Sequence, residues 1–130
     1  MTYQDIPKEL NDLSNEIIGL AIKVHKALGP GLLESSYKEC LFYEIANAGF
    51  FAEKEKKLPL VYGDVKLDAG YRIDILVENK LVIEIKALEA LADIHTAQVL
   101  TYLKLSGNRL GLLINFNVTL LKNGIKRLVL

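Results

Sequence analysis

The chain has 130 residues, a length that suits one domain built around one hydrophobic core. A composition of 51% hydrophobic and 25% charged residues is typical of a folded protein and excludes an intrinsically disordered chain. The 16 basic and 16 acidic side chains cancel, so the net charge gives no sign of a nucleic-acid partner, and any basic surface has to be local.

Cysteine content and hydropathy indicate the compartment. The single cysteine, Cys40, cannot form an internal disulfide, which fits a reducing environment. The first residues, "MTYQDIPKELNDLS", lack the charged and then apolar pattern of a secretory signal. No apolar run approaches the ~20 residues that a membrane-spanning helix needs. We therefore expect a soluble, cytoplasmic protein that makes no contact with a membrane.

Two helices are predicted in the first part of the chain. Between residues 10 and 28, apolar side chains recur at helical spacing and form one stripe that a core can bury. The "GPG" at residues 29–31 ends this helix, because glycine tolerates a left-handed cap and proline cannot continue a helix. A second helix is expected over residues 33–48, and Gly49 closes it.

After Gly49 the periodicity changes. Apolar residues alternate or run together, with turn signals at residues 63–64, 68–70 and 78–80, which predicts three or four antiparallel strands. Helical spacing returns over residues 93–105. The segment "RLGLLINF" then predicts a buried strand, and "IKRLVL" predicts a last short one. We expect an α/β fold with a central mixed sheet flanked by helices, in one domain spanning residues 1–130. The strands before and after the third helix should be parallel and joined by a right-handed crossover.

Three charged residues interrupt the strand-like segment "YRIDILVENKLVIEIKA". Glu84 and Lys86 are two residues apart and therefore share one face of a strand. Asp74, on the preceding strand, pairs directly with Glu84 if residues 78–80 form a three-residue loop. If residues 79–80 alone form the loop, the register shifts by one residue and Asp74 points away.

Converging carboxylates have a chemical use. Two neighbouring carboxylates repel each other, and partial burial strengthens the repulsion. Mg²⁺ or Mn²⁺ relieves it, because these cations prefer oxygen ligands, and each can activate water and neutralise charge on a phosphate. Lys86 can then orient or deprotonate the attacking water, or stabilise the transition state. The alternative is a solvated hairpin face without chemistry, since acids and Glu-x-Lys are common on strands.

The wider pattern resembles the RecB-like branch of the PD-(D/E)XK nuclease superfamily. That branch has Gly-x-x-x-Asp, Glu-x-Lys and Gln-x-x-x-Tyr in this order, and the chain has "GYRID", "EIK" and "QVLTY". Isoleucine, not proline, precedes Asp74, a departure that is common in RecB-like proteins. The segment "GLLESSY" resembles the signature of the small GxxExxY proteins, and the similarity extends over residues 17–127.

This resemblance implies a restriction-endonuclease-like core and a Mg²⁺- or Mn²⁺-dependent nuclease that acts on DNA. Asp74 and Glu84 are the implied metal ligands, with Glu34 as an additional acid near the metal. Lys86 is the implied catalytic lysine. A plainer interpretation of Glu34 is a carboxylate that complements the dipole of the second helix. Tyr37, one turn later, is expected in the core with its hydroxyl bonded to a neighbour.

Further side chains are candidates for contacts with the lysine or with the substrate. Gln98 and Tyr102 lie one helical turn apart and would face the site, where the resemblance implies a catalytic role for both. Candidates for substrate binding are Arg72, His95 and Lys104.

A short basic run lies at the start of the strand region. It comprises Lys54, Lys56 and Lys57 and is either a solvated strand edge or, if DNA binds, a source of contacts to the DNA backbone.

Two functions remain open from the sequence. One is a metal-dependent nuclease. The other is a module that keeps the nuclease fold with little or no catalysis and acts by binding protein or nucleic acid. Self-association would add surface in either case, because a chain of 130 residues offers little area for holding duplex DNA.

Overall fold

The structure is a computed structural model that describes residues 6–130. Its elements in chain order are α1 (Lys8–Leu28), α2 (Glu34–Asn47), β1 (Ala52–Tyr62), β2 (Val65–Val77), β3 (Leu81–Lys86), α3 (Asp93–Ser106), β4 (Leu110–Asn115), the 3₁₀ helix η2 (Leu121–Gly124) and β5 (Ile125–Val129). The expected α/β fold is confirmed, with three strands between α2 and α3.

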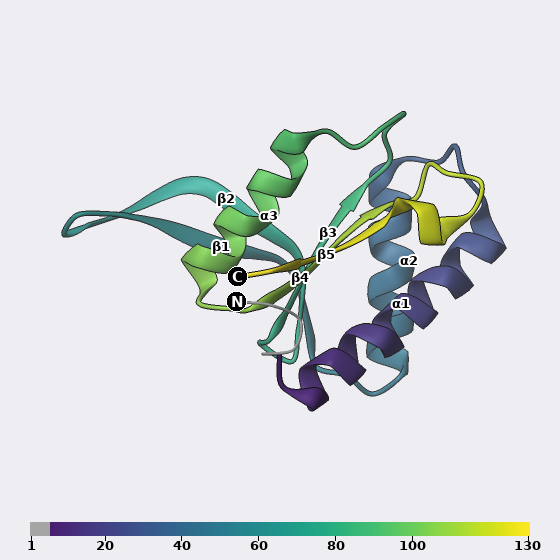
Figure 1. Cartoon of the computed structure of the whole chain (residues 1–130), viewed down its shortest axis with the longest axis horizontal. Helices are drawn as coiled ribbons and strands as arrows, with labels where there is room; N and C mark the ends of the chain where they lie inside the picture. Colours follow the sequence, from purple (N-terminus) through teal and green to yellow (C-terminus); the bar gives the residue numbers. More distant parts are fainter. Residues whose placement is uncertain (1–5) are drawn as a thin grey trace.

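The strands form one five-stranded mixed sheet in the order β1-β2-β3-β4-β5. β3 and β4 are parallel, and the other neighbouring pairs are antiparallel. The predicted parallel pair is thus confirmed, and α3 is the crossover that allows β4 to start in the same direction as β3. In Figure 1, α1 and α2 lie on one side of the sheet and α3 lies on the other.

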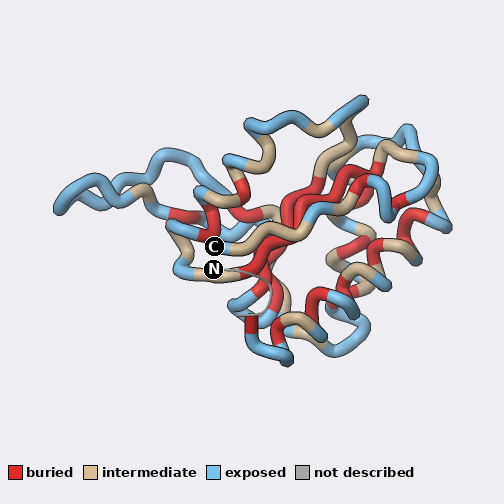
Figure 2. Tube along the Cα trace, viewed as in Figure 1, coloured by how far each residue is buried: buried red, intermediate tan, exposed pale blue. Residues whose placement is uncertain are grey.

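Apolar layers cover both faces of the sheet. The larger layer joins α1 and α2 to the sheet and includes Tyr37 and Ile83. The smaller layer joins α3 to the sheet and includes Val99 and Val82. β4 is buried along its whole length and β3 up to its last residue, as the red segments of Figure 2 show. A strand that is covered on both faces needs apolar residues on both, which explains the unbroken apolar runs in the sequence.

Tyr37 fixes the start of α2 in the core. Its hydroxyl donates to the carbonyl of Gly29 at 2.6 Å and accepts a hydrogen bond from the amide of Leu32 at 3.1 Å. Its ring stacks on that of Phe116, with centroids 4.6 Å apart. The predicted core role of Tyr37 is confirmed. These contacts set the position of the first turn of α2, where Glu34 lies.

α3 packs closely on β4 because Gly111 has no side chain. A Cβ atom at Gly111 would lie 2.8 Å from Cγ1 of Val99, closer than two carbon atoms can approach without a shift. Val99 is fully buried on α3 between the predicted site residues Gln98 and Tyr102. This contact therefore sets how near those two residues come to the sheet.

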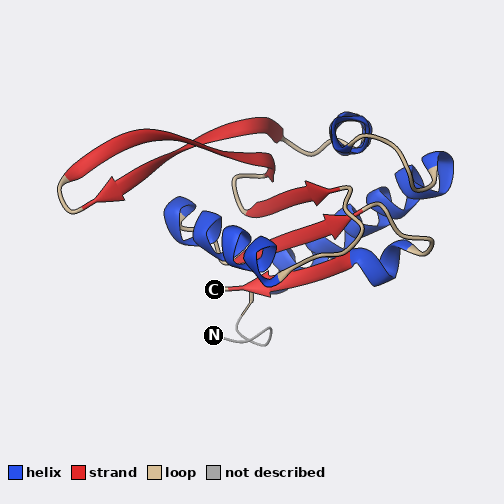
Figure 3. Cartoon of the chain, turned by 90° about the horizontal axis from the view of Figure 1, so that it is seen from above, coloured by secondary structure: helices blue, strands red, loops and turns tan. Residues whose placement is uncertain are grey.

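The outer part of the β1–β2 hairpin, residues 57–72, projects beyond the rest of the molecule, and we call it the arm (Figures 1 and 3). The predicted turn at residues 63–64 forms its tip. The predicted turn at residues 68–70 is wrong, because β2 continues through these residues, which bulge opposite Pro59. Gly70 there has φ 81° and donates its amide to the Asp68 carboxylate at 3.1 Å, so turn-forming residues make a bulge instead.

Within residues 6–130, no helix is both long and apolar enough to cross a membrane. The predicted lack of a signal peptide concerns, in part, residues 1–5, which lie outside the described residues.

Candidate functional site

The loop between β2 and β3 determines where Asp74 points. Residues 78–80 form a three-residue turn, whose first two residues have φ values of 52° and 55°. Val77 consequently pairs with Leu81. Continued along the hairpin, this register places Asp74 opposite Glu84. Of the two alternatives that the sequence left open, the structure has the one that brings the carboxylates together.

The two carboxylates replace the backbone ladder at this point. Regular pairing of β2 with β3 ends at Ile75 and Ile83, the pair next to Asp74 and Glu84. Beyond it, the amide of Asp74 donates to Oε2 of Glu84 at 2.8 Å, and the amide of Ile85 donates to Oδ2 of Asp74 at 2.8 Å. Each side chain thus holds the backbone of the opposite strand, and the two acids fill the gap between β2 and β3.

Glu84 lies in an environment that disfavours its charge. Its exposed fraction is only 3%. Burial, and then the neighbouring Asp74 carboxylate, raise the pKa of Glu84 to about 9, while the ammonium of Lys86 has a smaller, opposite effect. Without a further cation, this acid keeps a proton at neutral pH. Loss of this proton places two negative charges side by side, and a bound cation relieves that repulsion.

The strand faces change at Asp74. The sequence places Ile73 and Ile75 on the same face, but Ile73 packs in the α3 layer and Ile75 in the layer of α1 and α2. Opposite Asp74 on β1, Glu55 has φ 54°, and the β1–β2 ladder skips this pair. The twist turns the arm relative to the rest of the sheet (Figure 3). It also brings Asp74 near side chains from both α2 and α3.

From α2 comes Lys38, a residue that was not predicted from the sequence. Its Nζ lies 3.1 Å from Oε1 of Glu55 and 4.0 Å from Oδ1 of Asp74. Burial is the largest single influence on the pKa of Lys38 and lowers it, but Glu55, Asp74 and Glu34 together outweigh burial and raise the pKa. The only sequence signal was its place one helical turn after Glu34, which is too common to be specific.

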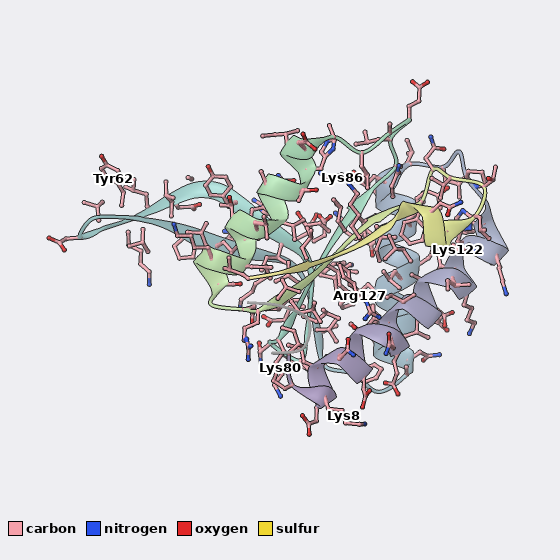
Figure 4. The ribbon with its side chains drawn as sticks, viewed as in Figure 1. Lys8, Tyr62, Lys80, Lys86, Lys122 and Arg127 are labelled. Carbon is pink, nitrogen blue, oxygen red and sulfur yellow. The ribbon has the colours of Figure 1, made fainter. Side chains whose placement is uncertain are left out.

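From α3 come Gln98 and Tyr102, whose side chains contact each other one helical turn apart. The side-chain amide of Gln98 donates to the Tyr102 hydroxyl at 3.3 Å. Burial, followed by the charges of Glu84 and Asp74, raises the pKa of Tyr102, which shows that this hydroxyl lies in the field of the acid pair. Lys86, at the end of β3, lies between α3 and α2 in the view of Figure 4.

Asn115 holds the segment that follows Lys86, a role the sequence did not reveal. Asn115 is 2% exposed and pairs with Lys86 across β3 and β4. Its side chain accepts a hydrogen bond from the amide of Leu88 at 3.0 Å and donates to the Leu88 carbonyl at 3.0 Å. The same oxygen accepts a hydrogen bond from the amide of Asn117 at 3.2 Å. The only sequence signal was an asparagine at the end of an apolar run.

The remaining predicted residues are exposed or have other contacts. Nδ1 of His95 accepts a hydrogen bond from the amide of Ala92 at 2.8 Å and so caps α3. Lys104 is exposed in the last turn of α3, two residues after Tyr102 and therefore on a different face of the helix. Arg72 is exposed at the base of the arm, two residues before Asp74.

Glu34 acts electrostatically on Lys38. It lies in the first turn of α2, one turn before Lys38, whose pKa its charge helps to raise. Among residues 6–130, no group of three or more histidine, cysteine, aspartate or glutamate side chains is arranged to hold a metal ion. The structure thus brings Asp74 and Glu84 together as a pair, and Glu34 does not join them in a group of three acids.

A mixed sheet with Asp and Glu-x-Lys on a central hairpin, beside a helix that carries Gln-x-x-x-Tyr, is the arrangement that defines a protein with a PD-(D/E)XK nuclease core. A comparison with known protein families agrees, because residues 11–128 match the PD-(D/E)XK nuclease superfamily. The chain belongs to this superfamily. No curated protein and no solved structure has significant similarity to it.

Proposed function

We propose that the chain is a divalent-metal-dependent nuclease that hydrolyses phosphodiester bonds of DNA. The observation that carries this proposal is the meeting of Asp74 and Glu84 in the gap between β2 and β3, each 2.8 Å from a backbone amide of the other strand. Membership of the PD-(D/E)XK nuclease superfamily supports it.

The donor set fits Mg²⁺ or Mn²⁺. Both acids offer oxygen ligands, which these cations prefer, and the pKa of Glu84 is raised by burial first and by the neighbouring Asp74 carboxylate second. Mg²⁺ commonly uses one or two protein carboxylates and completes its shell with water and substrate phosphates, so a pair of acids is sufficient. When bound, the metal supplies Lewis-acid polarisation of the phosphate and lowers the pKa of water.

The side chains around the pair have distinct proposed roles. Asp74 and Glu84 hold the metal. The Lys86 ammonium orients the water nucleophile and stabilises the negative charge that develops on the phosphate. Tyr102, positioned by Gln98, donates a hydrogen bond toward the substrate phosphate from the α3 side.

We also assign the chain to the GxxExxY proteins, within the RecB-like branch. The motif "GLLESSY" begins at Gly31 and ends at Tyr37. Tyr37 anchors the start of α2, and the charge of Glu34 helps to raise the pKa of Lys38. In this assignment the motif places α2 so that Lys38 reaches Asp74.

Two measurements test the nuclease proposal together. Isothermal calorimetry with Mn²⁺ should give heat of binding for the wild type and none for Asp74→Asn, whose amide oxygen can still accept the Ile85 hydrogen bond. Asp68→Asn is the matched control, because Asp68 lies on the same strand and also bonds a backbone amide. We expect the control to bind Mn²⁺ normally.

Cleavage is measured on plasmid DNA with Mg²⁺ or Mn²⁺, with RNA as a second substrate. We expect Lys86→Ala to lose cleavage while it still binds Mn²⁺. Cleavage that persists in this variant comes from a contaminant or another site and contradicts the proposal. Preferential cleavage of RNA corrects the substrate and leaves the metal site in place.

One observation favours a second function, a module that acts by protein interaction or self-association. The arm carries exposed apolar residues, including Tyr62 at 77%, Val65 at 51% and Leu67 at 45% exposed. Exposed apolar patches often mark interaction sites. Sedimentation of the wild type and of Tyr62→Ser tests this. A wild-type dimer that the variant loses supports it, and a wild-type monomer argues against self-association.

A further inference from the structure

The arm has two chemically different faces. Residues opposite each other on β1 and β2 share a face, and successive pairs alternate between faces. The apolar pairs are Leu58 with Tyr71, Leu60 with Leu67 and Tyr62 with Val65. The pairs between them are Lys57 with Arg72 and Val61 with Lys66. One face is therefore apolar, and we call the other, which carries Lys57, Arg72 and Lys66, the cationic face.

The cationic face holds positive charges with little compensation. Lys57 and Arg72 are direct cross-strand partners, and like charges in this position destabilise a hairpin. Among the ion pairs within residues 6–130, none includes Lys57, Arg72 or Lys66. Two acids lie on this face, Glu55 at its inner end and Asp68 beside Lys66. The ammonium of Lys38 already binds Glu55 at 3.1 Å, and the Asp68 carboxylate accepts a hydrogen bond from the Gly70 amide at 3.1 Å. An external anion would relieve the repulsion.

The other lysines of the same hairpin differ in this respect. Nζ of Lys54 lies 2.6 Å from Oε2 of Glu39 and 4.9 Å from the centroid of the Phe42 ring. Nζ of Lys56 lies 2.9 Å from Oε2 of Glu53. Of the basic run seen in the sequence, two lysines are thus neutralised by protein groups. The contrast makes Lys54 and Lys56 a matched control for the cationic face.

The cationic face leads outward from the acid pair. Arg72 is two residues from Asp74, a separation of about 7 Å along an extended strand. Lys66 lies opposite Val61. Val61 is six residues along β1 from Glu55, which lies across from Asp74, so Lys66 is roughly 20 Å along the arm from Asp74. Tyr62 marks the tip, well outside the body of the molecule (Figure 4). The charges therefore form a line that begins at the site and extends away from it.

We propose that the arm is a DNA-docking element whose cationic face follows the phosphate backbone of a duplex bound at the site. This inference rests on the proposed nuclease function and names the surface that holds its substrate. A two-stranded ribbon fits the major groove of B-DNA, and about 20 Å of arm corresponds to roughly six base pairs. Lysine and arginine supply the phosphate contacts, which give affinity without sequence preference.

The test is binding of a short fluorescent duplex in EDTA, by anisotropy, over a range of NaCl concentrations. Removal of a phosphate contact lowers the salt slope by about one. We expect the double variant Lys57→Ala, Arg72→Ala to bind roughly tenfold more weakly and to lower the slope by about two. The control double variant Lys54→Ala, Lys56→Ala, with the same change in charge, should stay within about twofold of the wild type. Lys57→Arg with Arg72→Lys should bind like the wild type.

The outcomes separate this inference from the nuclease proposal. Equal weakening in the test and control variants means that net charge alone matters, and it overturns the docking role of the arm. If the double variant Lys57→Ala, Arg72→Ala binds the duplex with wild-type affinity, the docking role of the arm is also overturned, even if Mn²⁺ binding and cleavage are normal. If the wild type neither binds Mn²⁺ nor cleaves DNA, but the two double variants still differ as expected, the nuclease proposal fails and the docking role stands.

Discussion

Asp74 and Glu84 hold β2 and β3 together with their side chains at the point where the backbone ladder stops. The amide of Asp74 donates to the Glu84 carboxylate at 2.8 Å, and the Asp74 carboxylate in turn accepts a hydrogen bond from the amide that follows Glu84 at 2.8 Å. The acids therefore maintain the gap that they occupy. Uncharged amides can keep these hydrogen bonds and remove only the charge, which makes the site testable without loss of the fold.

The first prediction concerns the pH dependence of stability in the metal-free protein. The pKa of Glu84 is about 9 in the folded state, above its ordinary value of 4.5, so the folded protein holds this proton more tightly than the unfolded chain. The stabilisation is complete below about pH 4.5 and is lost as the pH rises toward about 9. Between about pH 5 and pH 8, the wild type should lose roughly 2–4 kcal/mol that Glu84→Gln does not lose.

Urea unfolding in EDTA measures this difference, because the other titrating groups are common to both proteins. Parallel stability curves for the wild type and Glu84→Gln would show that Glu84 is ionised in the folded state.

The second prediction concerns Lys38. Its ammonium lies 4.0 Å from Oδ1 of Asp74 and competes there with any bound cation. Lys38→Met removes the charge and keeps most of the side-chain volume, so Mn²⁺ should bind about fivefold more tightly, an effect of about 1 kcal/mol for a partly screened pair. Calorimetry checks this, with Lys38→Arg as the control that keeps the charge. Weaker binding in Lys38→Met would show that Lys38 instead holds Asp74 in place for the metal.

The third prediction concerns Asn115. Asn115→Ala leaves two backbone groups without partners, namely the amides of Leu88 and Asn117, and leaves the Leu88 carbonyl with only the longer bond from the Asn117 side chain at 3.4 Å. We expect a loss of about 2–3 kcal/mol in the free energy of unfolding. Cleavage should also slow, because the segment after Lys86 is released. Asn108→Ala is the control, since within residues 6–130 the Asn108 side chain bonds only the Ser106 hydroxyl, and it should cost under about 1 kcal/mol.

Chemical denaturation of both variants measures the stability, and single-turnover cleavage by the folded fraction measures the activity. Equal costs at Asn115 and Asn108 would contradict the role given to Asn115.

The fourth prediction concerns the contact between α3 and β4. Gly111→Ala places a methyl group 2.8 Å from Cγ1 of Val99, a stiff, buried side chain that cannot turn aside. The expected cost is about 1–3 kcal/mol, with slower cleavage because α3 carries Gln98 and Tyr102. Adding Val99→Ala to Gly111→Ala should restore part of both, which melting and cleavage assays can follow. A double variant less stable than the sum of the single changes would argue against this contact.

Much of the fold could be predicted because its signals are local. The apolar stripe of α1 and the unbroken apolar run of β4 each reflect the surroundings of one element. Gly70 shows the limit of such signals. A glycine that follows Asp-Ala predicts a turn, but the same conformation also makes a bulge, and pairing with β1 decides between them.

The sequence alone determined the elements, their order and the acids and lysine that carry the motif, because periodicity and residue spacing report local structure. Only the tertiary structure decided that Asp74 faces Glu84, since a shift of one residue in the hairpin loop would have turned it away. It also decided that Lys38, Glu55 and Asn115 belong to the site. These residues come from separate elements, and only the packing of α2, β1 and β4 around β2 and β3 brings their side chains within hydrogen-bonding distance of the site and its supporting segments.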